Sequence, residues 1–280
     1  MGLLTRLRDI RQNTLKIPAL QAAAVADYLE THLYRNPKYA DPRGLTRYER
    51  QTYSQGGEDG IIAEIVRRIG APGKTFAEFG VTDGLECNTA FLLAQGWRGT
   101  WIDGDRRYLK AIARKFGFLM DEGKLKVLHA FITRENIEGL FREAQVPTEL
   151  DFLSIDIDGN DYWVWKALSS YRPRAVVIEY NAFFGPEARW VMRYNPDHVW
   201  NRQGTYYGAS LKSLELLGRE MGYTLVGASF TCTNAFFVRD DLVGDHFLPP
   251  FTSEALYEPP RYFLLRRNGH ASDFGPFEIR

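Results

Sequence analysis

From Tyr53 onward the chain alternates short apolar runs with segments whose apolar residues recur at helical spacing. The apolar runs predict strands at Phe76–Phe79, Thr100–Ile102, Lys126–Leu128, Phe152–Ile157 and Ala175–Ile178. The helical spacing predicts helices at Asp59–Ile69, Leu85–Ala94, Arg106–Gly117, Asn136–Ala144, Tyr162–Leu168 and Ser210–Met221. Strands that alternate with helices pair in parallel through right-handed crossovers. We therefore expect an α/β fold with a doubly wound, mostly parallel sheet.

The last two apolar runs break this alternation. Thr224–Ala228 and Ala235–Val238 are separated only by residues 229–234. Such a link is too short for a crossover helix and long enough for a hairpin. We therefore predict that Tyr223–Arg239 forms a hairpin and that its final strand is antiparallel to the others.

The two ends of the chain differ from this central part. Residues 1–50 carry helical patterns and end in a segment rich in proline, so we expect a helical N-terminal appendage. It precedes a main domain at 51–245 and a C-terminal extension at 246–280. Leu3, Leu7 and Ile10 recur at helical spacing between arginines. We favour packing of this appendage on the core or on a second copy of the chain over a basic helix lying on a membrane.

Composition excludes several classes of function. The 35 basic residues balance the 35 acidic ones among 280, so no basic surface for nucleic acid is expected. The two cysteines, Cys87 and Cys232, cannot form a disulfide framework and lack metal-ligand spacing. No apolar run approaches the ~20 residues of a membrane span, and the first residues do not resemble a secretory signal. We expect a cytoplasmic protein.

The turn after the first predicted strand has the composition of a ligand site. Glu78, Gly80, Asp83 and Gly84 follow one another there, and the second strand ends in Asp103. A strand, a glycine turn, a helix and a strand ending in an acid form a nucleoside pocket in doubly wound sheets. Carboxylates in the turn would repel a pyrophosphate, so the pattern favours a ligand with a ribose and a cationic group. The neighbouring Asp105 is predicted to cap the next helix instead.

Acidic and amide side chains also end the fourth and fifth predicted strands. They are Asp156, Asp158, Glu179 and Asn181. Ligands of open α/β sheets bind at the carboxyl ends of the strands, and hard oxygen atoms suit Mg²⁺ or Ca²⁺. The pattern has three interpretations. The side chains bind a metal ion, or Asp158 or Glu179 acts as a general base, or the side chains form hydrogen bonds at the strand ends without a metal.

A long irregular segment, Asn181 to Gly208, follows the fifth predicted strand. Irregular segments of this length in compact domains are usually functional. This one combines aromatic residues with arginines, which suit a sugar ring and an acidic group on an acceptor. His198 is its only histidine and a candidate base. His129 is predicted to lie near the end of the third strand without a catalytic role.

Three segments resemble the FkbM-like family of class I S-adenosylmethionine-dependent methyltransferases. They are Tyr53–Gly60, the turn from Glu78 to Thr89, and Ser154–Asp161. The family often has Glu-Pro where this chain has Asp103-Gly104, and Asp-x-Glu-Gly where it has Asp156-Ile157-Asp158-Gly159. Both departures keep an acid in place.

The resemblance implies a seven-stranded Rossmann-like sheet and S-adenosylmethionine as cofactor. The implied cofactor residues are Gln55, Glu78, Gly80, Asp83, Gly84, Asn88, Asp103 and Asp156. The acids after strands four and five are similar to those with which some sugar O-methyltransferases hold Mg²⁺. The implied activity is methyl transfer to a hydroxyl of a sugar, glycan or sugar-derived metabolite. A sugar oxidoreductase with a nucleotide cofactor and a non-catalytic binding module remain alternatives.

Overall fold

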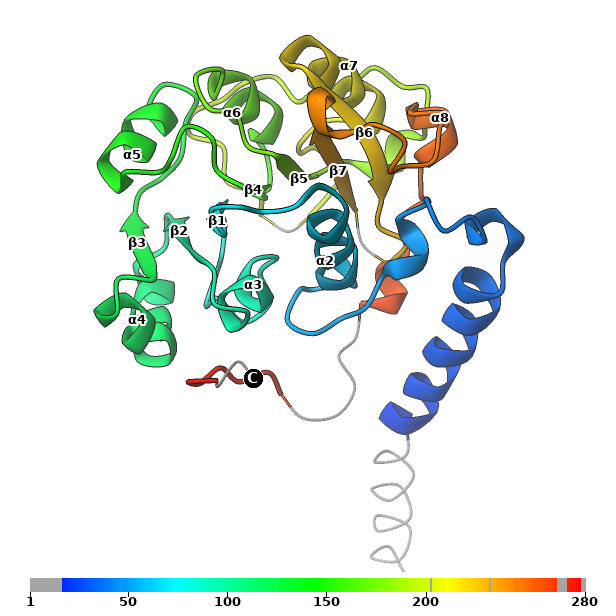
Figure 1. Ribbon diagram of the computed structural model, residues 1–280, viewed down its shortest axis with the longest axis horizontal. Helices are drawn as coiled ribbons and strands as arrows, with labels where there is room; N and C mark the ends of the chain where they lie inside the picture. Colours follow the sequence, from blue (N-terminus) through cyan, green and yellow to red (C-terminus); the bar gives the residue numbers. More distant parts are fainter. Residues whose placement is uncertain (1–16, 202, 232, 266–270, 278–280) are drawn as a thin grey trace, which may run out of the picture.

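Seven strands form one sheet in the computed structural model, which describes residues 17–201, 203–231, 233–265 and 271–277. The strands are β1 (Thr75–Phe79), β2 (Arg98–Asp103), β3 (Leu125–His129), β4 (Phe152–Ile155), β5 (Ala175–Glu179), β6 (Tyr223–Ala228) and β7 (Asn234–Arg239). They lie in the order β3-β2-β1-β4-β5-β7-β6 (Figure 1). β1 to β5 pair in parallel, whereas β7 is antiparallel to both β5 and β6. The predicted fold class and the predicted C-terminal hairpin are confirmed.

Helices cover both faces of this sheet. They are α2 (Glu58–Ile69), α3 (Ala90–Ala94), α4 (Arg106–Asp121), α5 (Ile137–Ala144), α6 (Asp161–Ala167), α7 (Leu211–Met221) and α8 (Ser253–Leu256). One apolar cluster joins α2, α3 and α4 to the sheet through residues such as Phe116 and Phe152. A second joins α5, α6 and α7 to the opposite face through residues such as Trp165 and Phe237. Successive side chains of a strand point to opposite faces of the sheet, and here both faces carry apolar residues, so helices pack on both sides.

Two predicted elements are shorter in the structure than in the sequence pattern. The helix predicted at Leu85–Ala94 begins only at Ala90, because the backbone N–H groups of Asn88 and Thr89 donate to Glu78. The strand predicted to reach Ile157 ends at Ile155. There the N–H of Ile157 donates to the carboxylate of Asp161 at 2.8 Å. In both places a buried carboxylate accepts hydrogen bonds from backbone N–H groups that would otherwise belong to the predicted helix or strand.

The N-terminal appendage is helical over residues 17–29 and continues as a π-helical turn, η1 (Glu30–Tyr34). Short 3₁₀ turns follow, η2 (Pro37–Tyr39) and η3 (Thr46–Tyr48). The appendage packs on the β6–β7 link through Leu33, Tyr39 and Phe230. Of the two predicted kinds of packing, the structure shows contact with the main domain, and packing on a second copy stays a prediction. The apolar pattern of Leu3, Leu7 and Ile10 lies outside the described residues.

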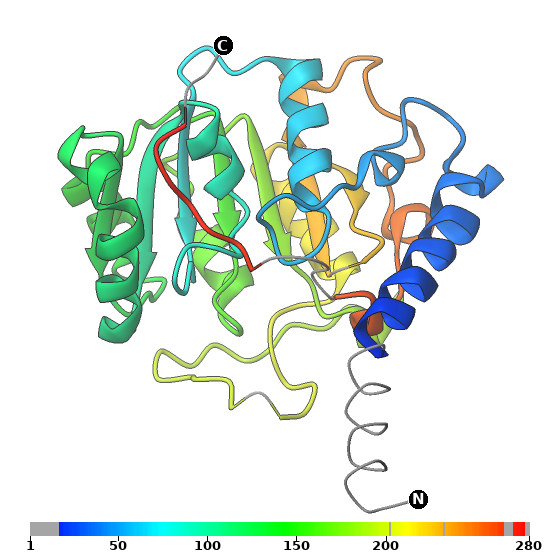
Figure 2. The ribbon, with the colours of Figure 1, turned by 90° about the horizontal axis from the view of Figure 1, so that it is seen from below.

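The C-terminal extension follows the 3₁₀ turn η5 (Asp240–Leu242) and runs back over the domain. It contains α8 and the 3₁₀ turn η6 (Tyr262–Leu264), which also packs on the appendage through Leu264. Figure 2 shows the last segment, in red, on the side of the sheet that carries α3. There the ring of Phe274 lies 4.5 Å from that of Phe116. In the described residues no helix combines the length and the apolar composition needed to cross a membrane.

Glu49 joins the N-terminal appendage to the hairpin. Its buried carboxylate accepts the N–H groups of Phe230 and Thr231 at 2.7 and 2.9 Å and also the Thr231 hydroxyl. Burial raises the pKa of Glu49 to about 7, against these hydrogen bonds, which lower it. Glu49 therefore binds its proton more tightly in the folded state than in the unfolded state.

This raised pKa predicts a pH-dependent stability. The usual pKa of a glutamate is 4.5, and that of Glu49 in the folded protein is about 7. Between these two pH values the folded protein holds more protons than the unfolded chain, so the free energy of unfolding falls as pH rises. We expect Glu49→Gln to reduce that fall by on the order of 2 kcal/mol relative to wild type. Denaturant unfolding at pH 4.5 and 7.5 measures it, with the exposed Glu143→Gln as control. Equal pH slopes in wild type and Glu49→Gln would contradict this account of Glu49.

Candidate functional site

The turn after β1 requires glycine at two positions. Gly80 has a φ of +72°, and a Cβ on it would lie 1.7 Å from the backbone oxygen of Asp156. Gly84 has a φ of +83°, and a Cβ there would lie 2.7 Å from the Trp101 ring. Both glycines were predicted to let backbone approach a ligand. In the structure they also let the turn pack against β2 and the end of β4.

Glu78 holds this turn in shape from inside the protein. Its Oε1 atom accepts the Asn88 N–H at 2.8 Å and the Ser154 hydroxyl at 3.0 Å. Its Oε2 atom accepts both the N–H, at 3.0 Å, and the hydroxyl of Thr89. Burial raises the pKa of Glu78, whereas these hydrogen bonds lower it. The sequence predicted a cofactor contact for this residue, and what the structure shows is that its carboxylate supports the turn.

Asp103 lies at the carboxyl end of β2, next to the same turn. Its oxygens accept the Thr82 N–H at 2.9 Å and the Asp105 N–H at 2.8 Å. Each carboxylate oxygen has a further lone pair, so two vicinal hydroxyls can still be bound. Burial raises the pKa of Asp103. Asp105 caps α4 by accepting the N–H of Arg107, as the sequence predicted.

A cavity of about 100 Å³ opens beside the glycine turn. Its lining includes five of the predicted cofactor residues, namely Gln55, Glu78, Gly80, Asn88 and Asp156. Asp83, Gly84 and Asp103 do not line it; Asp83 instead accepts the N–H of Leu85 at 3.1 Å. The structure thus brings the end of β4 and the turn after β1 to one cavity.

The segment Tyr53–Gly60 contributes Gln55 to this cavity, and two buried acids that were not predicted as site residues hold the segment in place. Asp59 accepts the N–H groups of Thr52, Tyr53 and Ser54, which fixes the loop before α2. Glu58 accepts the Gly56 N–H and the Asn234 side-chain amide, both at 2.9 Å. These bonds tie the loop that carries Gln55 to β7. In the sequence, the two acids directly after the pair Gly56-Gly57 were the signal that could have identified them.

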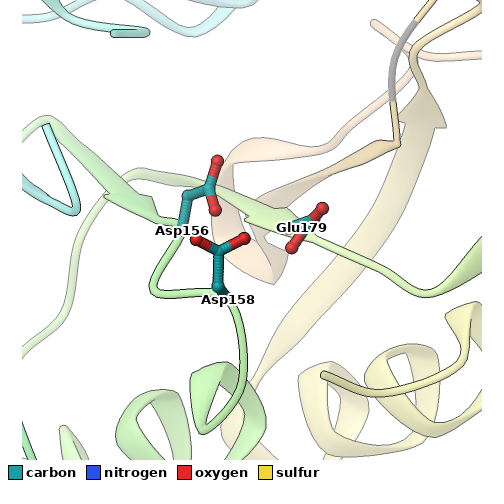
Figure 3. Close-up of side chains that lie close together, drawn as sticks. All are labelled: Asp156, Asp158 and Glu179. Carbon is teal, nitrogen blue, oxygen red and sulfur yellow. The ribbon is translucent and has the colours of Figure 1, made fainter. Parts of the chain in front are cut away.

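Three acids form a cluster at the ends of β4 and β5. One oxygen from each of Asp156, Asp158 and Glu179 lies within 4.8 Å of one from each of the others. Figure 3 shows the three side chains converging. Burial, followed by the charge of neighbouring acids, raises the pKa of Asp156 and of Glu179 well above the usual range. The cluster therefore has an excess of negative charge that a proton or a cation would relieve.

The donor set of this cluster fits a hard divalent cation. Three carboxylates from two neighbouring strand ends can each offer one oxygen, which is the ligand type that Mg²⁺ and Ca²⁺ prefer. Oε2 of Glu179 is buried and accepts no hydrogen bond from the described residues. Asp158 adopts a φ of +54°, and Asp161 holds the turn around it by accepting the Ile157 and Gly159 N–H groups.

Asn181, the fourth predicted metal ligand, is engaged in the loop that follows β5. Its amide nitrogen donates to the backbone oxygens of Thr205 and Tyr207 at 2.8 and 3.0 Å. Its amide oxygen accepts the N–H of Phe183 at 3.3 Å. Asn181 thus ties the start of the long loop to its end.

His198 packs on the turn that carries the acid cluster. A Cβ added to Gly159 would lie 2.4 Å from the His198 ring, so the ring covers the residue next to Asp158. Its Nε2 atom is buried and has no hydrogen-bond partner among the described residues. Two hydrogen bonds hold the loop there. The Asn160 side-chain amide donates to the Asn195 carbonyl at 2.7 Å, and the Gly208 N–H donates to the Gly159 carbonyl at 3.1 Å.

One exposed aromatic residue near the ends of β2 and β3 was not predicted. Phe131 is 49% exposed and lies against Gly104, where an added Cβ would be 3.4 Å from its ring. The Nε2 atom of His129 donates a hydrogen bond to the Gly104 carbonyl at 2.9 Å. An aromatic residue three positions after a predicted strand end was the signal for this group.

The strand order, with β7 inserted antiparallel between β5 and β6, defines the fold of class I S-adenosylmethionine-dependent methyltransferases. No protein-family model and no curated protein matches the sequence.

Solved structures of low identity align with the chain. A S-adenosylmethionine-dependent methyltransferase from Clostridium acetobutylicum is 12% identical, with 76% of this chain and 99% of that one covered and a TM-score of 0.42. The N-terminal domain of EvdMO1 with SAH bound is 11% identical, with coverages of 65% and 79% and a TM-score of 0.41. A putative O-methyltransferase from Klebsiella pneumoniae is 14% identical, with coverages of 64% and 78% and a TM-score of 0.41.

The geometry at Gly80 predicts a position-specific loss of stability. In Gly80→Ala a steric clash with Asp156 adds to the strain of a positive φ, so we expect a loss of roughly 3–5 kcal/mol. Gly222→Ala is the matched control, because Gly222 has a φ of +81° and no atom within 4 Å of an added Cβ. It should lose only about 1–2 kcal/mol. Denaturant unfolding compares the two, and similar losses would show that the Asp156 contact imposes no constraint.

Proposed function

We propose that the protein is an S-adenosylmethionine-dependent O-methyltransferase that acts on a hydroxyl of a sugar, a glycan or a sugar-derived metabolite. The observation that carries this proposal is the position of Asp156. It lines the cavity beside the glycine turn and also belongs to the acid cluster. A cofactor bound in the cavity would present its methyl group close to carboxylates that can assist a hydroxyl.

The cofactor's parts match the surroundings of the turn. We assign the ribose hydroxyls to Asp103 and the adenine ring to the exposed face of Phe131, which lies beside Gly104. The methionine end would enter the cavity lined by Gln55, Gly80 and Asn88. Asp156 would place negative charge near the sulfonium, which is favourable for a cation.

Methyl transfer to a hydroxyl requires removal of a proton. The hydroxyl oxygen forms a bond to the methyl carbon as the carbon–sulfur bond breaks, and the neutral thioether leaves. The hydroxyl proton passes to a base, because an alcohol is too weak a nucleophile when protonated. Asp158 and Glu179 are candidates in the cluster, and His198 offers an unpartnered Nε2 beside it.

A divalent cation fits the same cluster. We propose Mg²⁺ held by Asp156, Asp158 and Glu179, whose oxygens are the donors available there. Such an ion would lower the pKa of a nearby acceptor hydroxyl. The carboxylates of the cluster would also position that hydroxyl and receive or relay its proton.

Within the class, we propose the FkbM-like group. Support comes from the way its three motif segments meet. Glu78 in the second accepts the hydroxyl of Ser154 in the third, and Gln55 in the first lines the same cavity. A nucleotide-dependent oxidoreductase is disfavoured by the carboxylates around the turn and the antiparallel hairpin. A non-catalytic module is disfavoured by the converging acids and the unpartnered atoms of Glu179 and His198.

The ribose assignment predicts a weaker complex with S-adenosylhomocysteine in Asp103→Asn. We expect affinity to fall about 10–100-fold, or about 1.5–3 kcal/mol, the scale for a lost charged hydrogen-bond partner. Isothermal titration calorimetry measures it. Asp105→Asn removes a neighbouring half-buried carboxylate and is expected to leave affinity unchanged within about twofold. Unchanged affinity in Asp103→Asn would remove Asp103 from the ribose role.

The acid cluster predicts a loss of turnover without a loss of cofactor. We expect Asp158→Ala and Glu179→Ala each to lower kcat at least about 100-fold, because their partners develop charge in the transition state. S-adenosylhomocysteine affinity should stay within about threefold. Methyl transfer from labelled cofactor to a sugar panel measures turnover, and the exposed loop variant Glu187→Ala is the control.

The same assay tests the metal. If Mg²⁺ takes part, chelation should abolish transfer and added Mg²⁺ should restore it. Full activity in chelator would instead leave the carboxylates as direct bases. Wild-type turnover in both alanine variants would refute the role of the cluster and move the search for a base to His198.

A further inference from the structure

Two exposed aromatic rings stand side by side at the edge of the proposed site. Phe183 belongs to the 3₁₀ turn η4 (Ala182–Phe184), which follows β5, and Tyr262 belongs to η6 in the C-terminal extension. They are 53% and 40% exposed, and their ring centroids are 6.0 Å apart at an interplanar angle of 38°. Large exposed aromatic surface is unfavourable in water, so a tilted pair of this kind is a candidate contact surface.

These two rings are held in place from below. The buried Tyr207 shares a hydrogen bond of 3.1 Å between its hydroxyl and that of Tyr262. The Tyr257 hydroxyl donates to the Ala182 carbonyl at 2.5 Å, and the Tyr180 hydroxyl donates to the Glu258 carbonyl at 2.6 Å. The C-terminal extension is thus bound to the segment that carries Phe183. A ligand would meet a preformed surface and would not have to order it.

The pair is connected to the acid cluster through the chain after β5 and through Tyr207. Phe183 follows Glu179 by four positions, and the Asn181 amide between them holds the backbone of Tyr207. Burial, and after it the charge of Glu179, raises the pKa of the Tyr207 hydroxyl, which places that hydroxyl within the field of the acids. A molecule resting on the two rings could therefore extend a hydroxyl towards Glu179.

The surface is suited to a neutral ring. Arg261, the cation beside Tyr262, already donates to Glu258 and to the Phe230 carbonyl and stacks 3.7 Å from the Phe230 ring centroid. An anionic group on the ligand would have to compete with these partners. A pyranose has an apolar face of C–H groups that packs on aromatic rings while its hydroxyls point outward.

We infer that Phe183 and Tyr262 form the platform that binds a pyranose ring of the acceptor, so that the C-terminal extension supplies part of the acceptor site. This inference rests on the proposed function. The Tyr262 hydroxyl acts as a positioning group through Tyr207, whereas the two rings provide the contact itself.

Saturation-transfer NMR with methyl α-D-glucopyranoside, methyl β-D-galactopyranoside and methyl α-D-mannopyranoside tests the platform. The full-length protein is used with saturating S-adenosylhomocysteine and Mg²⁺. For the pyranosides that bind wild type, Phe183→Ala and Tyr262→Ala are expected to reduce the signal at least fivefold. Tyr262→Phe keeps the ring but loses the hydrogen bond to Tyr207, so its signal should fall about two- to threefold, less than in Tyr262→Ala. Phe277→Ala removes another exposed aromatic ring, which packs on Phe274, and should change nothing.

Calorimetric titration of S-adenosylhomocysteine into the same samples separates this inference from the proposed function. Two outcomes with intact S-adenosylhomocysteine binding would overturn the platform alone. In the first, both alanine variants keep the pyranoside signals; in the second, wild type gives no pyranoside signal. Absence of S-adenosylhomocysteine binding in wild type would overturn the proposed function. Circular dichroism of each variant guards against unfolding, and Tyr262→Trp, which restores a ring, should recover the signal lost in Tyr262→Ala.

Discussion

The shape of the proposed site depends on one buried carboxylate, that of Glu78. A charge taken from water is costly unless donors surround it, and here two backbone N–H groups and two hydroxyls do so. Through these bonds β1 holds both the start of α3 and the middle of β4. The turn between them has one internal backbone bond, from the Gly84 N–H to the Val81 carbonyl, and Glu78 fixes its far end at Asn88 and Thr89.

The same turn connects the two halves of the site. Gly80 approaches the backbone of Asp156 so closely that no side chain fits between them. Asp156 in turn carries one carboxylate of the acid cluster. The cavity and the cluster therefore share one closely packed junction between the ends of β1 and β4. The long loop covers this junction from the other side, where His198 lies on Gly159.

Local pattern was sufficient to predict most of the fold. The alternation of strands with helices and the helical spacing of apolar residues can be recognised from residues close together in sequence. The link before β7 is too short for a crossover helix, so only a hairpin can join β6 to β7. The cap formed by Asp105 is local as well. The partners of Glu78 were not predictable in this way, since Ser154 is far away in sequence and its hydroxyl gives no periodic signal. Tyr262 likewise lies beside Phe183 only because the C-terminal extension folds back, and the side chain of Asn181 joins two ends of a loop that has no period.

The shared position of Asp156 has a thermodynamic consequence. Two ligands that interact with one carboxylate cannot bind independently, and each must alter the affinity for the other by the same factor. A cation at the cluster and a positively charged sulfonium in the cavity would compete for the charge of Asp156. The neutral thioether left after transfer would not compete in this way. Occupancy of the cluster would thus discriminate between the charged and the neutral form of the cofactor, a property that neither the cavity nor the cluster would have alone.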